Sequence, residues 1–326
     1  MNLEKFPLLD RLADFKVNEQ RWINMQRGID LLERWLEDQL VYGLAALESD
    51  AETRIESIAA QLVDNHLPGA ASSLRKLTSL IGSEQGWEED VQQELGYWHL
   101  ISKISRKPAL LSQDQLGGLL MTLGHRFRKT DITSAEPLPA SRWTCVGIEE
   151  GDDQNVYYRR TYWRGAVAKY AGVQLVFQYG APIPIGQTEV GTSAVIAVHA
   201  YPGGLPGRLE VPDQITLTPY DKCPHHFPTW QAQQDANEAV LVLQPWSRSM
   251  PISVGPLTVR FDESLESLCL LDLKSEVVLQ PCGKTDDASW TLLSLAAGTP
   301  AVVFGQYEMG QLILHAAWVG ERLYAL

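Results

Sequence analysis

A short segment of the chain combines one thiol with two imidazoles, the side chains that most often bind zinc. Cys223, His225 and His226 fall within four residues and could occupy two or three vertices of a zinc tetrahedron. No second C-x-x-C or H-x-x-x-H pair lies nearby, and adjacent histidines point in divergent directions. We therefore predict a structural loop at this position, and we expect neither a bound metal nor a cofactor.

Two glycine-containing segments have counterparts in catalytic loops. Residues 283–285 (Gly-Lys-Thr) match the end of a phosphate-binding loop, but Val278 stands where that loop needs its first glycine, and Asp286-Asp287 would repel phosphate. Gly203-Gly204 could form an oxyanion-hole loop, but the sequence has no G-x-S-x-G nucleophile elbow for it to serve. We predict turns at both positions.

Carboxylates and histidines are present, but their spacing indicates no catalytic site. Asp152-Asp153, Asp262-Glu263 and Asp286-Asp287 are acidic pairs in predicted turns, where solvated carboxylates are ordinary. His66, His99 and His125 fall in or at the ends of predicted helices, and nothing links them in sequence. We assign no catalytic residue. The alternative is an enzyme whose site forms only in the fold, from the following residues: His199, Asp213, Cys223, His225 and His226.

Aromatic side chains gather on one predicted strand. Tyr157, Tyr158, Tyr162 and Trp163 could form an exposed face that binds a protein partner, since such rings are enriched at interfaces. The other interpretation of these rings is core packing. Four further tryptophans fit apolar stripes and are expected in the core, namely Trp22, Trp35, Trp98 and Trp290.

The charge of the chain opposes binding to nucleic acid. The formal net charge is −13, and counterion release from a phosphate backbone requires a basic face. The local excesses of positive charge, residues 103–107 (KISRK) and 126–129 (RFRK), lie near predicted helix ends, where cations suit the helix dipole. A phosphate contact is the alternative for both.

The first part of the chain has the periodicity of helices. Apolar residues recur every three or four positions from Trp22 to Leu47, which predicts one long amphipathic helix. Ser49 with Glu52 has the spacing of a capping box, and Ser112 with Gln115 has the same spacing. Further apolar stripes predict helices at 50–67, 74–81, 91–107 and 112–123, and the Pro-containing stretch 131–140 is the predicted linker.

After the linker the period changes from 3.6 towards 2, which predicts antiparallel strands. The predicted strands lie at 143–148, 156–163, 173–179, 194–201, 257–261, 268–273, 276–279, 290–296, 301–307, 311–318 and 322–324. The Pro- and Gly-rich stretch 202–212 is predicted to be a loop or an irregular edge, and one helix is expected near 229–243, ended by Pro245. The fold class is therefore α+β, with an all-α domain at 1–130 followed by a mainly antiparallel β domain at 141–326.

Composition indicates a globular cytoplasmic protein. The chain has 326 residues, of which 45% are hydrophobic and 21% charged, so it can form two cores and is not disordered. It contains no apolar run of the roughly 18–20 residues that cross a bilayer, and its start lacks the features of a signal peptide. Four scattered cysteines, Cys145, Cys223, Cys269 and Cys282, are expected to be reduced thiols.

Several motifs resemble the region downstream of the zinc finger in bacterial SWIM zinc finger family proteins. They follow the order expected for that family and span nearly the whole chain. Their sequences are GIDLLERWLEDQLVYGLAALE from Gly28, AAQLVDNHLPGAASSLRKL, ELGYWHLI, TYWRGAVAKYAGVQLVFQYG, LQPWSRSMPI and SWTLLSLAAGTPAVVFGQYEMGQLILHAAW. The family's C-x-C…C-x-H zinc ligands are absent from the sequence, so zinc and nucleic-acid binding by that finger are not carried over.

The resemblance implies protein partners. Relatives in that family tend to be encoded beside MoxR-type AAA+ ATPases and von Willebrand A-domain proteins, which implies a bacterial adaptor or scaffold associated with such a system. We therefore expect a binding protein and not an enzyme. The two alternatives are the cleft enzyme described above and a nucleic-acid-binding accessory that acts through its helical half.

Overall fold

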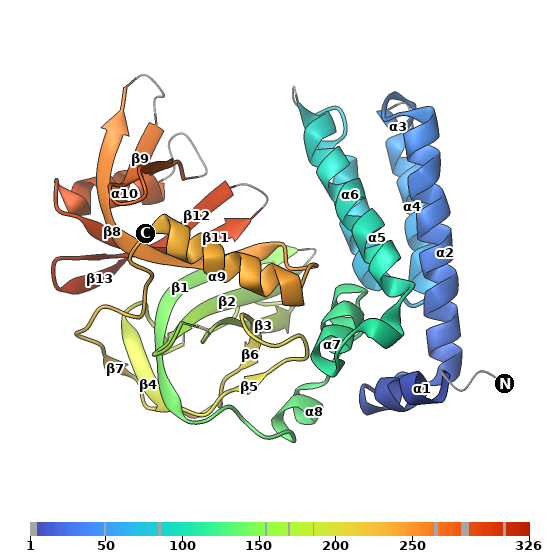
Figure 1. Cartoon of the computed structure of the whole chain (residues 1–326), viewed down its shortest axis with the longest axis horizontal. Helices are drawn as coiled ribbons and strands as arrows, with labels where there is room; N and C mark the ends of the chain where they lie inside the picture. Colours follow the sequence, from blue (N-terminus) through green and yellow to red (C-terminus); the bar gives the residue numbers. More distant parts are fainter. Residues whose placement is uncertain are drawn as a thin grey trace. The chain divides into compact units, whose positions relative to one another are not determined.

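The computed structural model describes residues 5–48, 50–83, 86–153, 155–168, 170–184, 186–263, 267–281, 287–308 and 311–326. The chain forms two compact units, Met1–Arg128 and Lys129–Leu326 (Figure 1). The first unit is helical, and the second consists mainly of strands. This confirms the predicted fold class, α+β with the helices first. Cys282 and the predicted turn at 283–286 lie outside the described residues.

Four helices of the first unit form a bundle because each has one apolar stripe to bury. The helices and the one short 3-10 turn (η1) of this unit are α1 (Lys5–Asp14), α2 (Glu19–Tyr42), α3 (Ala45–Glu48), α4 (Ala51–Asp64), α5 (Pro68–Leu80), α6 (Trp87–Ser105), η1 (Pro108–Leu110) and α7 (Gln113–Thr122). Contacts join α2 with α4 and α6, and α5 with α4 and α6. The buried face includes Met25, Ile29, Leu62, Leu74 and Trp98.

The ends of these helices follow local chemistry. At the start of α7, Ser112 accepts from the Gln115 N–H while the Gln115 side chain accepts from the Ser112 N–H, which confirms that capping box. The predicted single helix from Trp22 to Leu47 is wrong at Gly43. There the backbone takes φ 76° and ψ 164°, a conformation that is nearly confined to glycine, so α2 ends at Tyr42. Ser49, the other predicted cap, lies outside the described residues.

The second unit contains two sheets, and the first has seven strands in the order β5-β6-β3-β2-β1-β4-β7 (Figure 1). A short helix, α8 (Lys129–Thr133), precedes them and overlaps the start of the predicted linker at 131–140. The strands are β1 (Ser141–Asp153), β2 (Val156–Gly165), β3 (Ala171–Tyr179), β4 (Thr192–Ile196), β5 (His199–Ala200), β6 (Gly207–Glu210) and β7 (Thr218–Pro219). Their pairing is antiparallel except for β3 with β6. Part of the stretch 202–212, predicted to be a loop or an irregular edge, forms β6, which pairs with β3 and with the short edge strand β5.

The second sheet has six strands in the order β10-β9-β8-β11-β12-β13. The strands are β8 (Ser249–Asp262), β9 (Ser267–Asp272), β10 (Val277–Leu279), β11 (Ala301–Glu308), β12 (Gln311–Val319) and β13 (Arg322–Ala325). Two helices, α9 (Trp230–Leu243) and α10 (Asp287–Ala296), bury Trp230 and Leu292 against this sheet. The helix expected near 229–243 is confirmed, and Thr229 caps its start.

Residues 290–296 were predicted to form a strand and instead belong to α10. A short apolar run fits either structure, and the contact of Leu292 and Ala296 with the sheet decides for a helix. Trp290 is also not in the core, as its exposed fraction is 47%. It stacks on Phe261 with 5.2 Å between ring centroids.

The two sheets pack on one another through a small apolar cluster. Val146 and Tyr162 come from the first sheet, whereas Val302, Phe304 and Ala316 come from the second. The opposite face of the first sheet buries Trp143, Trp163 and Leu209 under its own loops. Among the described residues, none of the helices is long and apolar enough to cross a membrane.

Candidate functional site

Two β-bulges lie at the junction between the sheets, within the second unit. In β1 the pairing with β2 shifts between Cys145 and Gly147, and in β12 the pairing with β11 skips His315. A bulge turns a side chain out of the regular alternation of its strand. The two bulges meet, because a Cβ added to Gly147 would lie 2.6 Å from the His315 Cβ. Only glycine therefore allows this approach of the sheets.

Glu149 on β1 organises the polar groups beside these bulges. Its Oε2 accepts a hydrogen bond from the Tyr162 hydroxyl at 2.8 Å, and its Oε1 accepts one from Arg160 Nη1 at 2.7 Å. Arg160 also lies over the ring of Tyr158, with 4.8 Å from Cζ to the ring centroid. Burial raises the pKa of Glu149, but the bonds from Tyr162 and Arg160 outweigh it and hold this pKa below its usual value.

His315 stacks on Tyr162 with the ring centroids 4.2 Å apart and the planes at 17°. Burial lowers the pKa of His315 to about 4, although the nearby Glu149 opposes this shift. Burial also raises the pKa of Tyr162, and its bond to Glu149 adds to that rise. At neutral pH, His315 and Tyr162 are both uncharged, and the site's charges are those of Glu149 and the arginines.

The predicted metal candidates occupy a loop before α9, where they separate into two environments. Cys223 Sγ lies 3.5 Å from His226 Nδ1, whereas His225 Nδ1 accepts a hydrogen bond from Arg164 Nη2 at 3.0 Å. Burial raises the pKa of Cys223 to about 12, which keeps it a neutral thiol, a poor ligand and a poor nucleophile. Within the described residues, no three His, Cys, Asp or Glu side chains are grouped as a metal would require.

The side chains proposed for a cleft enzyme have separate partners. His199 lies on β5 opposite Glu210, and Asp213 accepts from Lys129 Nζ at 2.6 Å. Neither shares a hydrogen bond with Cys223, His225 or His226 in the described part of the chain. Within the described residues, the contact that this set retains is the one between Cys223 Sγ and His226 Nδ1.

The predicted aromatic face is only partly exposed. Tyr162 and Trp163 are buried, one under the second sheet and the other under the loops of the first, so both follow the core interpretation and neither belongs to an exposed face. Tyr157 and Tyr158 are half-buried near the start of β2, where this strand pairs with the end of β3. Phe177 lies opposite Tyr158 on β3, and Tyr179 lies opposite Val156. Because paired residues share a face, Tyr158, Phe177 and Tyr179 form one aromatic patch, hereafter the hairpin patch.

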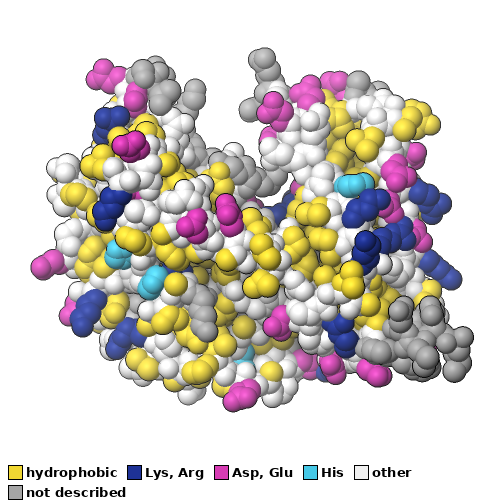
Figure 2. All heavy atoms as spheres, in the orientation of Figure 1, with side chains coloured by type: hydrophobic (Ala, Val, Ile, Leu, Met, Phe, Trp, Pro, Cys, Tyr) yellow, Lys and Arg dark blue, Asp and Glu magenta, His cyan; other side chains and the backbone are white. Residues whose placement is uncertain are grey.

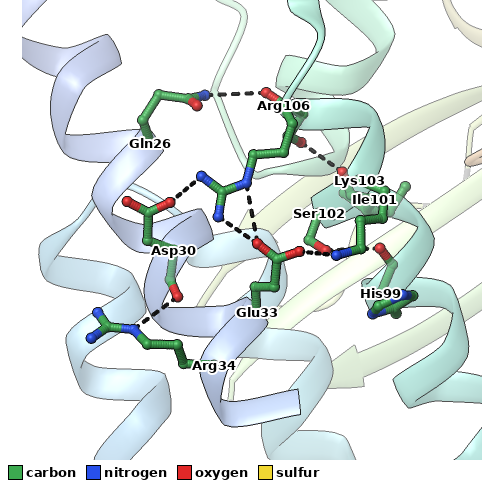
Figure 3. Close-up of polar contacts among 10 residues, drawn as sticks. Gln26, Asp30, Glu33, Arg34, His99, Ile101, Ser102, Lys103 and Arg106 are labelled. Carbon is green, nitrogen blue, oxygen red and sulfur yellow. Dashed lines mark hydrogen bonds and ion pairs between the residues drawn. The ribbon is translucent and has the colours of Figure 1, made fainter. Parts of the chain in front are cut away.

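The basic stretch at 103–107 in the helical unit is neutralised by acids of α2. Figure 3 shows Lys103 of α6 and Arg106, just after the end of that helix, pointing at Glu33 and Asp30. Arg106 Nε donates to Glu33 Oε2 at 3.1 Å, and bonds from Lys103 and Arg106 lower the pKa of Glu33. These cations connect two helices, which favours the structural interpretation over a phosphate contact.

Sequence reasoning missed the polar residues of the junction, namely Glu149, Arg160, Arg164 and His315. One signal was present, because Arg160, Tyr162 and Arg164 alternate on a predicted strand and so share a face. The bulges that aim His315 at Tyr162 have no comparable signature in the sequence.

The helical unit is a four-helix bundle of α2, α4, α5 and α6. Residues 20–120 match the family model described as the SWIM-associated four-helix bundle domain, so this part of the chain is such a domain. The predicted resemblance to the SWIM zinc finger family is confirmed there, and it stays a prediction for the β unit. No curated protein matches the chain. No solved structure matches it either.

Proposed function

We propose that this chain is a non-enzymatic adaptor that binds one protein partner through each of its two units. The observation that carries the proposal is an exposed apolar surface on each unit. In the β unit this is the hairpin patch, where the exposed fractions of Phe177 and Tyr179 are 56% and 77%. Exposed aromatic side chains of this kind are enriched at protein interfaces.

The second surface lies on the helical unit, at the end of α2. Leu40, Val41 and Tyr42 are consecutive and largely exposed, and a groove of about 510 Å³ between α2 and α6 is lined by Leu36, Leu40 and Leu95. Figure 2 shows hydrophobic side chains gathered over this end of the helical unit. An apolar groove between two helices suits the apolar face of a partner helix.

The class of partner follows from the resemblance to the SWIM zinc finger family. The resemblance implies relatives that tend to be encoded beside MoxR-type AAA+ ATPases and von Willebrand A-domain proteins. We propose that these are the two partners. The fold of residues 20–120 as a SWIM-associated bundle supports this choice. The proposal assigns no catalytic step to the chain.

The test is native purification of the tagged full-length protein from its host, with mass spectrometry and a metal assay on the same eluate. We expect a stoichiometric AAA+ ATPase or A-domain protein. The double variant Phe177→Ser/Tyr179→Ser should lose one partner, and Leu40→Ser/Val41→Ser should lose the other.

Matched controls are available in both units. Val195 is 61% exposed on β4, and Leu110 is 78% exposed, the same fraction as Leu40. Val195→Ser and Leu110→Ser should retain both partners. Recovery of the protein alone, or equal loss of partners in the variants and the controls, would overturn the adaptor proposal.

A further inference from the structure

The junction between the two sheets holds a cavity of about 280 Å³ that is partly open to solvent. Its apolar walls include Val146, Val173, Ile252 and Phe304, and Arg160, Arg164 and His315 also line it. At about 30 Å³ per water molecule, this volume corresponds to roughly nine waters. A mostly apolar cavity with a few convergent polar groups is the usual form of a small-molecule site.

Arg164 is the unusual residue of this cavity. Its exposed fraction is 4%. Its Nε donates a hydrogen bond to the His225 carbonyl at 3.0 Å, and its Nη2 donates one to His225 Nδ1 at 3.0 Å. Its guanidinium lies 5.7 Å from the centroid of the Phe227 ring. In the described part of the chain, no carboxylate pairs with Arg164 and its Nη1 makes no hydrogen bond.

A buried cation without an anion is costly, because it has lost its hydration and gained no opposite charge. Burial lowers the pKa of Arg164 to about 10, which leaves it charged at neutral pH. The neighbouring imidazole does not relieve this, since burial also lowers the pKa of His225, and a neutral His225 accepts from Arg164. Among the described residues, Arg164 therefore has no anionic partner.

The other charges around the cavity limit an anionic ligand to a single negative charge. Arg160 is already paired with Glu149 at 2.7 Å, and the neutral His315 contributes none. Glu308, a lining residue on β11, would repel a dianion. The apolar walls further select a ligand that has an apolar body.

We propose that this cavity binds a small organic monocarboxylate, whose carboxylate accepts hydrogen bonds from Arg164 and whose apolar body packs between Val173 and Phe304. The size favours a compact body such as one aromatic ring. Phe177 and Tyr179 of the hairpin patch do not line this cavity, and the proposal does not depend on protein binding.

The competing interpretation is that Arg164 serves only to hold the loop at 225–227 through its two bonds to His225. Both interpretations predict that loss of Arg164 lowers stability. Only the proposed site predicts that a carboxylate binds the wild-type protein and that its neutral analogue does not.

The experiment is calorimetric titration of the full-length protein with sodium benzoate, with benzamide and inorganic phosphate as comparison ligands. We expect benzoate to bind, and benzamide and phosphate to bind at least about tenfold more weakly, since one lacks the charge and the other the apolar body. Equal binding of benzoate and benzamide would overturn the proposal. So would the absence of benzoate binding at about 10 mM.

Three variants locate the site. Arg164→Gln should weaken benzoate binding about ten- to a hundredfold, the usual value of hydrogen bonds to a charged group. Arg159→Gln is the matched control, because Arg159 is also on β2 but lies on the opposite face of the strand and pairs with Glu150. Val173→Phe should fill the cavity and abolish binding while leaving Arg164 intact, so it decides the question if Arg164→Gln does not fold. Wild-type affinity in either Arg164→Gln or Val173→Phe would refute the assignment.

Discussion

At the scale of single residues, the junction of the two sheets shows how position sets chemistry. Cys223 and His226 have the side chains of a zinc site, yet burial keeps the Cys223 thiol protonated and no third ligand is near them among the described residues. Arg164 and His315 belong to no chemical motif that the sequence indicates, but the fold buries both beside a cavity. Function at this scale follows from surroundings more than from residue type.

Because His315 is buried, the free energy of unfolding is expected to depend on pH. Its pKa is about 4 in the folded chain, below the ordinary 6.5, so the unfolded chain binds a proton that the folded chain refuses. Stability is therefore lost as pH falls from 6.5 towards 4. We expect His315→Phe, which keeps a ring on Tyr162, to reduce the loss between about pH 7 and 4.5 by roughly 2–3 kcal/mol.

Urea unfolding of wild type and His315→Phe at the two pH values measures this difference. His225 has a lowered pKa for the same reason, so the variant is expected to retain some acid sensitivity. An identical loss of unfolding free energy in the two proteins would show that His315 titrates normally in the folded chain.

At the scale of elements, two glycines of the helical unit have opposite roles. Gly43 ends α2 with φ 76° and ψ 164°, whereas Gly96 lies inside α6, and a Cβ at either position would meet nothing within 4 Å. Steric space is thus equal, and only backbone conformation differs. The apolar periodicity continued past Gly43, which is why the sequence predicted a single helix there.

The pair Gly43→Ala and Gly96→Ala tests this reasoning. Gly43→Ala should destabilise the protein by about 1–3 kcal/mol, because a side chain disfavours that conformation. Gly96→Ala should stabilise it by about 0.5–1 kcal/mol, since alanine loses less backbone entropy in a helix. The measurement is urea unfolding followed by circular dichroism. Changes of the same sign in both variants would contradict the assigned backbone conformations.

At the scale of the whole molecule, acidic residues dominate, with a formal net charge of −13. The basic stretch at 103–107 contributes Lys103 and Arg106 to ion pairs with Glu33 and Asp30. Lys129, from the second basic stretch, pairs with Glu210 and Asp213 inside the β unit. These cations are therefore already compensated by acids of the same unit.

We expect no binding of nucleic acid by the full-length protein. Non-specific binders reach dissociation constants of about 10⁻⁴–10⁻⁶ M through counterion release, which this charge distribution does not provide. Fluorescence anisotropy with labelled duplex and single-stranded DNA at low salt should stay flat, with a basic DNA-binding protein as the positive control. Saturable binding that weakens with added salt would contradict the expectation.

The sequence by itself determined the helical first half, the β-rich second half and the likeness to the SWIM-associated bundle. These follow from periodicity, capping boxes and short motifs, which are local in the chain. The α10 segment was misassigned because the short, mostly apolar stretch 290–296 is compatible with either structure until it meets a sheet. For Tyr162 and Trp163 the sequence left both an exposed face and core packing open, because a strand does not encode what will cover it.

Only the tertiary structure decided the site. Bulges in β1 and β12, separated by more than a hundred residues of sequence, meet at Gly147 and His315, and the neighbouring Val146 and His315 line the cavity. Burial of Arg164 without a carboxylate results from the packing of β2 against the loop at 225–227. Such effects depend on desolvation and on contacts between distant segments, and neither is encoded in local spacing.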